Sequence, residues 1–333
     1  MKKVICILMC VIIALPMCFV AGAKEETVAG TLSAKSAILM EMSTGKVLME
    51  SNPDEKLSPA SITKVMTILL TFEALESGQI KLEDRVTASR NASSKGGSQI
   101  WLKEGEVMTV HELLKATVIA SANDACTALG EYIAGDETSF VSMMNEKAKA
   151  LGMENTCFLN STGLPSDGHY TCARDIALMT RELLKYDDVK NYTLIWMDTL
   201  RNGEFGLSNT NKLIRFYPGA TGMKTGFTDN ARRCLVSAAE RDGVTLICVT
   251  LNAPNDWQDH TKLLDYGFSA VENRQIELEQ IPTVSVIGGV KDCVALEPQE
   301  PLAVSVTASQ QVETQICLEP FLYAGVEQGE QAG

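Results

Sequence analysis

Three short polar motifs stand in a fixed order along the chain, and together they hold the groups that serine acyl transfer needs. A serine hydroxyl is a weak nucleophile near neutral pH, so it requires a base within hydrogen-bond reach and donors for the developing oxyanion. The chain has only 3 histidines, so lysine must be considered as that base. The motifs are Ser61-Ile62-Thr63-Lys64, Ser121-Ala122-Asn123 and Lys224-Thr225-Gly226.

The first motif is weak evidence by its spacing alone, because the same spacing occurs at Ser43-Thr44-Gly45-Lys46. Its context is more informative. The apolar run from Ile62 to about Glu76 predicts a largely buried helix with Ser61 near its N-terminus. Residues three apart share a helix face, so Lys64 can approach the Ser61 hydroxyl. The alternative is that Ser61 only caps the helix and that Lys64 is exposed.

The second motif also has another copy, at Ser89-Arg90-Asn91. The copy at Ser121 differs because it lies between two predicted helices, directly after the apolar run Leu113–Ala120. A loop between packed helices can hold the Ser121 hydroxyl and the Asn123 carboxamide in place. A helix cap remains the alternative for this motif.

The third motif occurs once, against a chance expectation of roughly 0.1 at ordinary residue frequencies. Gly222 and Gly226 bracket a stretch able to run as an edge strand, whose backbone a ligand can approach closely. Lys224 and Thr225 offer a cation and a hydroxyl, which suit a carboxylate. The alternative is an ordinary turn.

With their flanks, the three motifs resemble the signature of penicillin-binding proteins and serine β-lactamases. The resemblance is narrower to exported, low-molecular-mass D-alanyl-D-alanine carboxypeptidases, and it runs from about Ser33 to Gly267. The segments that carry it are Pro59–Thr67, Ser121–Cys126, Asn160–Leu164, Ala173–Asp175 and Gly222–Thr228.

The resemblance implies a serine peptidase that removes the last D-alanine of a peptidoglycan stem peptide, uses no cofactor or metal, and is inhibited covalently by β-lactams. It implies Ser61 as the nucleophile, Lys64 as its base and Ser121 as the proton relay to the leaving amine. Lys64 must then be largely neutral, which requires its pKa to fall by roughly three units from about 10.4. Burial and the charge of Lys224 would both lower it.

The resemblance also implies how the substrate is held. Asn123 would hold a substrate amide, Lys224 and Thr225 the terminal carboxylate, and the backbone amides of Ser61 and Phe227 the oxyanion. Some relatives carry histidine where this chain has Phe227, so the pH behaviour can differ. The substrate-binding residues implied in this way are Asn123, Lys224, Thr225, Gly226 and Phe227.

Two alternatives to this function stay open. A β-lactamase would use the same acylation groups plus a deacylating base, which in one class is a glutamate acting through water. Glu154 is the candidate between the second and third motifs, but it lies too far from Leu159-Asn160 for the usual spacing. The other alternative is a non-catalytic penicillin-binding or wall-binding protein, against which the three intact motifs argue.

The apolar patterning predicts an α+β fold, a β-lactamase/transpeptidase-like domain with helices flanking an antiparallel sheet. Residues 24–273 would form this catalytic domain and residues 274–333 a small β-rich domain that reads as incomplete. Expected helices, besides the first, are Val110–Val118, Asp124–Ile133, Phe140–Leu151, Asp175–Leu184 and Asp259–Tyr266. Expected strands are Ser36–Glu41, Lys46–Glu50, Leu235–Ala239, Val244–Leu251, Thr283–Ile287 and Ala303–Val306.

Residues 1–23 match a secretory signal, with Lys2-Lys3, an apolar run and small residues ending at Ala23. A membrane anchor is the alternative. Export predicts an extracytoplasmic enzyme. Relatives commonly end in an amphipathic anchoring helix; none is visible here, so membrane attachment stays open, as does the oligomeric state.

Charge and cysteine content narrow the partners further. Without residues 1–23 the net charge is 27 minus 42, or -15, which argues against nucleic acid as a partner. Seven cysteines would remain after export, without a C-x-x-C pair, so the sequence indicates no metal or redox centre and leaves their pairing open.

Overall fold

The computed structural model describes residues 4–5, 9–16, 28–276, 283–289, 292–297, 302–307, 310–317 and 321–323. The chain divides into two compact units. The larger unit is Ala23–Phe268, and the smaller unit combines Met1–Gly22 with Ser269–Gly333. The domain boundaries expected from the sequence stay predictions.

The larger unit is built on a five-stranded antiparallel sheet, with strand order β4-β3-β11-β10-β9. Most residues of the sheet are buried, and Asp242-Gly243, both with positive φ, form the tight turn between β10 and β11. β9 lies at one edge of the sheet. The strands are β3 (Ser36–Glu41), β4 (Val47–Ser51), β9 (Ala220–Thr228), β10 (Arg232–Arg241) and β11 (Val244–Leu251).

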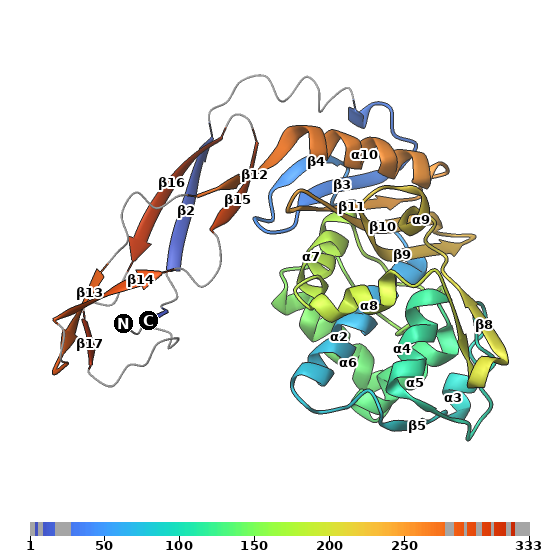
Figure 1. Ribbon diagram of the computed structural model, residues 1–333. Coiled ribbons are helices and arrows are strands. Elements are labelled where there is room, and N and C mark those ends of the chain that lie inside the picture. The colour runs from blue at the N-terminus through green and yellow to red at the C-terminus, as the bar shows by residue number, and fades with distance from the viewer. Residues whose placement is uncertain are drawn as a thin grey trace. The chain divides into compact units, whose positions relative to one another are not determined.

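Helix α10 (Asp256–Ala270) covers one face of this sheet, and most of the other helices lie on the opposite side (Figure 1). The expected α+β fold is therefore confirmed. The main helices on that opposite face are α2 (Lys64–Glu76), α4 (Val110–Ile119), α5 (Asn123–Ala134), α6 (Glu137–Ala150) and α7 (Ala173–Leu183).

One helix boundary differs from the expectation in a way that matters for the site. The sequence predicts a continuous helix from Ile62, whereas the structure begins with a 3-10 turn, η1 (Ala60–Thr63), and α2 starts at Lys64. In a 3-10 helix the side chains at i and i+3 eclipse one another. The tighter turn therefore places the side chains of Ser61 and Lys64 on the same side of the helix, one above the other.

Short elements connect the main ones. They are β5 (Arg85–Thr87), α3 (Arg90–Ser93), β6 (Val107–Thr109), η2 (Asp187–Val189), α8 (Lys190–Thr193), β7 (Met197–Leu200), η3 (Arg201–Gly203), β8 (Phe205–Ser208) and α9 (Leu213–Phe216). The duplicate motif copies lie here and in the β3–β4 turn: Ser89 caps α3, and Gly45 occupies the turn with φ +72°.

The smaller unit is β-rich. Its strands are β1 (Val4–Ile5), β2 (Met9–Pro16), β12 (Val271–Gln275), β13 (Thr283–Ile287), β14 (Cys293–Glu297), β15 (Ala303–Thr307), β16 (Gln310–Cys317) and β17 (Phe321–Tyr323). One sheet has the order β1-β14-β13-β17, and the pairs β12-β15 and β16-β2 form two more. The expected export signal is described only at Val4–Ile5 and Met9–Pro16, and the chain's end after Tyr323 lies outside the described residues.

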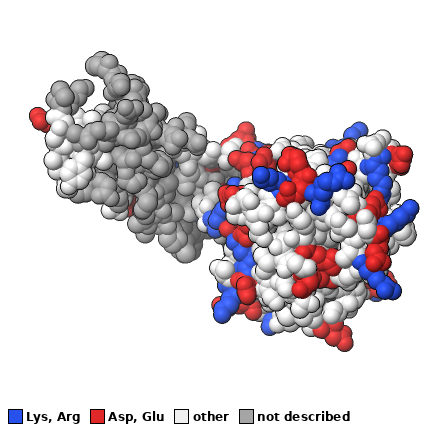
Figure 2. All heavy atoms as spheres, turned by 90° about the horizontal axis from the view of Figure 1, so that it is seen from below, with Lys and Arg blue, Asp and Glu red and all other residues white. Residues whose placement is uncertain are grey.

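On the face shown in Figure 2, acidic and basic side chains of the larger unit are interspersed. Within the described residues, no helix is both long enough and apolar enough to cross a membrane. Each cysteine whose side chain is described is a free thiol: Cys126, Cys157, Cys172, Cys234, Cys248 and Cys293.

Candidate active site

Ser61 lies in η1, where neighbouring backbone fixes its position. The residue before it, Ala60, has a positive φ of +48°, and the loop at Gly163 packs directly against it. A Cβ on Gly163 would lie 1.7 Å from the Ala60 carbonyl oxygen, so only glycine fits. The close contact holds the backbone of η1 against this loop.

Lys64 is fully buried and adjoins Ser61, with 2.9 Å between its Nζ and Ser61 Oγ. Its Nζ also lies 2.6 Å from Asn123 Oδ1 and 2.8 Å from the carbonyl oxygen of Thr162. As an ammonium, Lys64 donates to all of these acceptors. As a neutral amine it donates to Asn123 and Thr162 and accepts the Ser61 proton, so the same contacts suit both protonation states.

The electrostatics of the site shift Lys64 toward the neutral amine. Burial lowers the pKa of Lys64 to about 8, although Cys126 and Asp124 oppose part of the fall. The fall is smaller than the roughly three units expected from the sequence, so the amine is the minority form at pH 7. Burial, followed by repulsion from Lys64, holds the pKa of Lys224 well below its ordinary value.

Ser121 and Asn123 stand at the entry to α5. Ser121 is buried and has a positive φ of +60°, a costly conformation for a non-glycine residue. The backbone N–H of Asn123 donates to Ser98 O at 2.7 Å, and its Nδ2 donates to Gly96 O at 2.7 Å. Asn123 is therefore engaged at both ends of its carboxamide, with one Nδ2 hydrogen left for another acceptor.

The third motif lies on β9, as the edge strand that the sequence predicts. Gly226 faces the nucleophile turn: a Cβ there would lie 3.0 Å from Pro59 O and 3.1 Å from Ser61 N. This glycine thus lets β9 run close to the backbone amide of Ser61. Thr225 Oγ1 donates to Thr210 Oγ1 at 2.7 Å.

These groups surround an open pocket of about 360 Å³, within the usual size range of ligand sites. The structure brings Ser61, Ser121 and Thr225 to its wall, while Lys64 and Lys224 lie beneath the surface. The lining residues are Ser61, Ser98, Ser121, Thr210, Lys212, Thr225, Gly226, Phe227, Arg233, Asp256 and Trp257.

Sequence reasoning missed Arg233, which lines this pocket. Arg233 pairs with Phe227 across β10 and β9, and its guanidinium donates through Nε and Nη2 to Asp256 Oδ1 at 2.9 and 2.8 Å. Since residues of one strand alternate between faces, Thr225, Phe227 and Arg233 share a face. Lys224, next to Thr225 on β9, lies on the other face, is buried and donates to Thr225 O at 2.9 Å. The basic residues that line the pocket are therefore Arg233 and Lys212.

Histidine does not contact Ser61 in the described contacts. His169 is buried against the nucleophile turn, where it accepts from Leu159 N at Nδ1 and therefore donates from Nε2 to Thr63 Oγ1 at 2.9 Å. Burial lowers the pKa of His169 to about 4 and that of His260, which lies between Ser237 and Thr250, to about 3. Both histidines are neutral at ordinary pH. Among the described residues, no group of acidic, cysteine or histidine side chains is arranged to hold a metal ion.

Comparison with known proteins points to one family. The model of the family Peptidase_S11, D-alanyl-D-alanine carboxypeptidase, matches residues 22–255. The chain is 42% identical over 311 residues to D-alanyl-D-alanine carboxypeptidase DacF of Bacillus subtilis, covering 90% of this chain and 80% of that protein. It is 39% identical over 263 residues to DacC of Escherichia coli, covering 76% of this chain and 66% of that protein.

Solved structures agree with this result. Penicillin-binding protein D2 of Listeria monocytogenes, in its ampicillin-bound form, superposes with a TM-score of 0.66 at 31% identity, covering 72% of this chain and 98% of that one. A peptidoglycan synthesis regulatory factor, PBP3, from Streptococcus pneumoniae gives a TM-score of 0.74 at 32% identity, covering 84% of this chain and 87% of that one.

Proposed function

Because the chain belongs to the D-alanyl-D-alanine carboxypeptidase family of serine peptidases, we propose that it removes the terminal D-alanine from peptidoglycan stem peptides through an acyl-enzyme on Ser61. The observation that carries the proposal is the 2.9 Å contact between the buried Lys64 Nζ and Oγ of Ser61, which lines the pocket. A nucleophile and a base within hydrogen-bond reach are the minimum for such chemistry.

In the first step, neutral Lys64 accepts the Ser61 proton while Ser61 Oγ bonds to the carbonyl carbon between the two D-alanines. The oxyanion that forms would be stabilised by the backbone amides of Ser61 and Phe227. The close approach of β9 to Ser61 at Gly226 supports this role, because it brings the two backbone segments to one side of the nucleophile.

In the second step, the carbon–nitrogen bond breaks and the leaving amine takes a proton. Ser121, at the pocket wall, would relay that proton from the Lys64 ammonium to the amine. Water then attacks the ester, Lys64 accepts a proton from it, and Ser61 Oγ leaves with a proton. The enzyme returns to its starting state, with D-alanine and the shortened peptide released.

The substrate's terminal carboxylate needs donors at the pocket surface, and Thr225 and Arg233 supply them in this proposal. The guanidinium of Arg233 is fixed by the buried Asp256, so little side-chain freedom is lost on binding. Lys224, which donates to Thr225 O from beneath the pocket, would act through Thr225. Asn123, whose contacts hold Lys64, retains one N–H that can reach a substrate carbonyl.

β-Lactams are expected to acylate Ser61. The structural relative from L. monocytogenes has been solved with ampicillin and with cefotaxime bound. A strained cyclic amide with a carboxylate presents the same groups to the pocket as the terminal dipeptide does. Ring opening leaves the carbonyl attached to Ser61, so the product is a covalent adduct of the whole antibiotic.

The Ser61→Ala variant tests the proposal directly. We expect D-alanine release from a D-alanyl-D-alanine peptide to fall by at least about a thousandfold, because no other hydroxyl is paired with Lys64 in the described contacts. Covalent labelling by a fluorescent penicillin should disappear. Full D-alanine release by a folded Ser61→Ala protein would contradict the nucleophile assignment.

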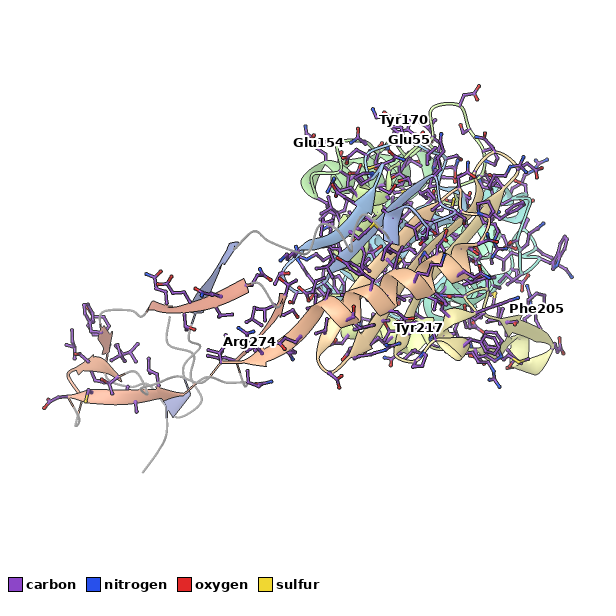
Figure 3. All side chains as sticks on the ribbon, turned by 90° about the horizontal axis from the view of Figure 1, so that it is seen from above. Glu55, Glu154, Tyr170, Phe205, Tyr217 and Arg274 are labelled. Atoms are coloured by element: carbon purple, nitrogen blue, oxygen red, sulfur yellow. The ribbon has the colours of Figure 1, made fainter. Side chains whose placement is uncertain are left out.

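A β-lactamase is the weaker candidate. Glu154, the only glutamate that the sequence analysis considered for deacylation, is exposed and lies at the margin of the larger unit (Figure 3). No glutamate is among the described residues that line the pocket. Rapid turnover of nitrocefin by the purified protein would overturn the carboxypeptidase assignment in favour of this one.

We propose further that the enzyme acts outside the cytoplasm. Peptidoglycan lies there, and residues 1–23 have the charged, apolar and small-residue zones of an export signal. Cleavage is expected after Ala23. N-terminal sequencing of the exported protein checks this, since a mature chain that keeps its first residues would contradict a cleaved signal.

A further inference from the structure

Lys64 depends on two protein acceptors besides Ser61, and each is delivered by a different segment. One acceptor is the carbonyl oxygen of Thr162, at 2.8 Å from Nζ. The other is Asn123 Oδ1, at 2.6 Å. The proton affinity and the orientation of the amine therefore depend on what holds these two oxygens in place.

The first segment is the loop 160–164. Asn160 Oδ1 accepts from the backbone N–H groups of Thr162 and Gly163 at 3.1 and 2.7 Å, which shapes the loop. Ser161 anchors it: its carbonyl oxygen accepts from Thr67 Oγ1 at 2.8 Å. The loop is thus tied to α2 through the backbone of Ser161, next to the carbonyl that faces Lys64.

The second segment is the loop 95–98, which holds Asn123. Gly96 O accepts from Asn123 Nδ2, and Ser98 O accepts from the Asn123 backbone N–H, each at 2.7 Å. Gly97, with φ +80°, lies so close that a Cβ there would be 2.8 Å from Asn123 Nδ2. The rotamer of Asn123, and with it Oδ1, follows the position of this loop.

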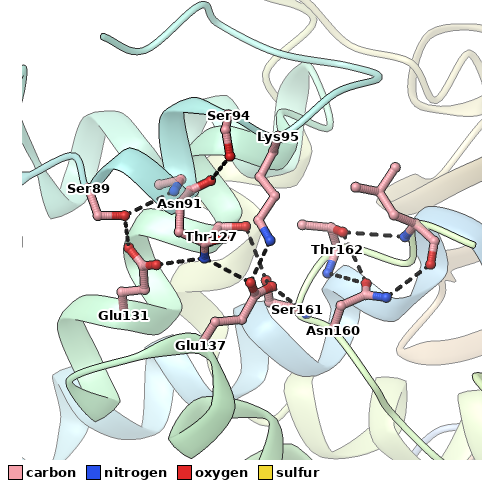
Figure 4. A network of polar contacts seen from close by, with 12 residues as sticks. Ser89, Asn91, Ser94, Lys95, Thr127, Glu131, Glu137, Asn160, Ser161 and Thr162 are labelled. Carbon is pink, nitrogen blue, oxygen red and sulfur yellow. Dashed lines mark hydrogen bonds and ion pairs between the residues drawn. The ribbon is translucent and has the colours of Figure 1, made fainter. Parts of the chain in front are cut away.

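Glu137 joins the two segments (Figure 4). Its Oε1 accepts from Ser161 Oγ at 2.9 Å, and its Oε2 accepts from Lys95 Nζ at 2.5 Å and from Asn91 Nδ2 at 2.9 Å. Lys95 directly precedes Gly96 in the chain. The Glu137 carboxylate therefore links Lys95 to Ser161. Lys95 precedes Gly96, whose carbonyl accepts from Asn123, and Ser161 precedes Thr162, whose carbonyl accepts from Lys64.

Stabilising the start of α6 does not explain this arrangement. The N-cap of α6 is Asp136, whose side chain already accepts from Ser139 N. Glu137 instead turns toward the two loops, where its side chain and that of Lys95 are only 16% and 17% exposed. Burial would raise the pKa of Glu137, but the hydrogen bonds from Asn91, Lys95 and Ser161 and the Lys95 charge keep it below its ordinary value.

We infer that Glu137 is a positioning residue that holds Thr162 O and Asn123 Oδ1 against the Lys64 amine through the loops 160–164 and 95–98. The inference rests on the proposed function of Lys64 as the base. Glu137 touches neither the substrate pocket nor Ser61 in the described contacts. Its effect should appear in the proton affinity of Lys64 and in the chemical step rather than in substrate binding.

The test compares Glu137→Gln with Glu73→Gln. Glu73 forms an equally short ion pair with α6, 2.5 Å from Lys147 Nζ, but makes no contact with either loop in the described contacts. In Glu137→Gln we expect kcat for D-alanine release to fall about ten- to a hundredfold with KM nearly unchanged, as a displaced catalytic group does. Glu73→Gln should keep both parameters while losing a similar amount of thermal stability.

A second readout does not depend on activity. The Lys64 side chain is titrated by NMR on the full-length protein, and its signal is assigned by its loss in Lys64→Arg. The titratable groups around Lys64 are Lys224, Asp124 and Cys126, and burial raises the pKa of the Cys126 thiol. In Glu137→Gln the midpoint should move to lower pH, because the ammonium loses the fixed position of its two protein acceptors, Thr162 O and Asn123 Oδ1.

Two further variants separate the contributions of the two loops. Ser161→Ala removes the hydroxyl contact between the loop 160–164 and the carboxylate and leaves the longer one from the Ser161 backbone N–H, 3.4 Å from Glu137 Oε1. Lys95→Met removes the ion pair between the loop 95–98 and the carboxylate. Each should give part of the Glu137→Gln effect, and each should add little in the Glu137→Gln background. A Lys64 midpoint that stays at or rises above the wild-type value, or equal losses in Glu73→Gln, would overturn the inference. Failure of the wild-type protein to release D-alanine would instead count against the proposed function.

Discussion

At the scale of single residues, the protonation of Lys64 sets the conditions under which the site can react. Its ammonium is fully hydrogen-bonded, so the resting site is stable but unreactive. When Lys64 loses one proton, its Nζ no longer donates to Ser61 Oγ but accepts a hydrogen bond from it. Reactivity therefore depends on burial, which lowers the pKa of the Lys64 ammonium.

The pH dependence of acylation follows from this. With a Lys64 pKa of about 8, the amine fraction falls about tenfold for each pH unit below that value. We expect the acylation rate by a penicillin to rise with pH from 6 to about 8 and then to level off. Stopped-flow labelling across this range measures it, with thermal unfolding at each pH as the control. A rate that falls as the pH rises through this range would contradict Lys64 as the base.

Arg233 gives a second prediction at this scale. Arg233→Ala removes the guanidinium that Asp256 holds at the pocket wall, so KM for a D-alanyl-D-alanine peptide should rise by about ten- to a hundredfold, as expected for a lost charged hydrogen bond. kcat should change less. Arg232→Ala, at the exposed neighbouring position, is the matched control. An unchanged KM would remove Arg233 from carboxylate recognition.

At the scale of elements, the contact between the loop at Gly163 and η1 is the tightest constraint on the nucleophile. Gly163→Ala places a Cβ where the Ala60 carbonyl oxygen lies, so the two segments must separate. We expect a loss of several kcal/mol in unfolding free energy and a much larger loss of acylation rate than a loss of stability alone would cause.

The control for that substitution is Gly152→Ala. Gly152 has a similar φ of +73°, against +85° at Gly163, but a Cβ there would meet no atom within 4 Å. Only backbone strain applies there, so we expect a cost of about 1 kcal/mol and normal acylation. Urea denaturation and penicillin labelling of both variants provide the comparison. Equal losses in the two variants would show that strain, rather than the contact with Ala60, is responsible.

Elements also explain which parts of the site the sequence could reveal. The β3–β4 hairpin, the main helices and the edge strand β9 follow from apolar spacing and turn residues, which are local signals. Thr162 could not be found in this way, because it contacts Lys64 from 98 residues away through a carbonyl group that every residue has. Arg233 was within reach, since pairing β10 with β9 from the turn outward places it opposite Phe227.

The start of α2 shows a different limit. The apolar pattern continues unbroken across Ile62 and Lys64, so nothing in it marks the change from a 3-10 turn to an α-helix. Tertiary contacts from Gly163 and Gly226 select the tighter turn. The 3-10 turn that positions Ser61 therefore cannot be predicted from the periodicity of the apolar residues alone.

At the scale of the whole molecule, every residue that lines the pocket comes from the larger unit. We expect residues 24–268, produced alone, to be acylated by penicillin within about twofold of the full-chain rate, since one compact unit carries its own core. Penicillin labelling and circular dichroism measure this. A folded but unlabelled fragment would show that the smaller unit contributes to the site.

The position of β9 at the edge of the sheet has one more consequence. An edge strand is a template on which an extended peptide can align through main-chain pairing, a mode known as β-augmentation. A ligand aligned in this way is recognised by its backbone and its chirality, while alternate side chains project away from the protein. A substrate residue upstream of the scissile bond whose side chain projects away in this manner would then be tolerated in several forms.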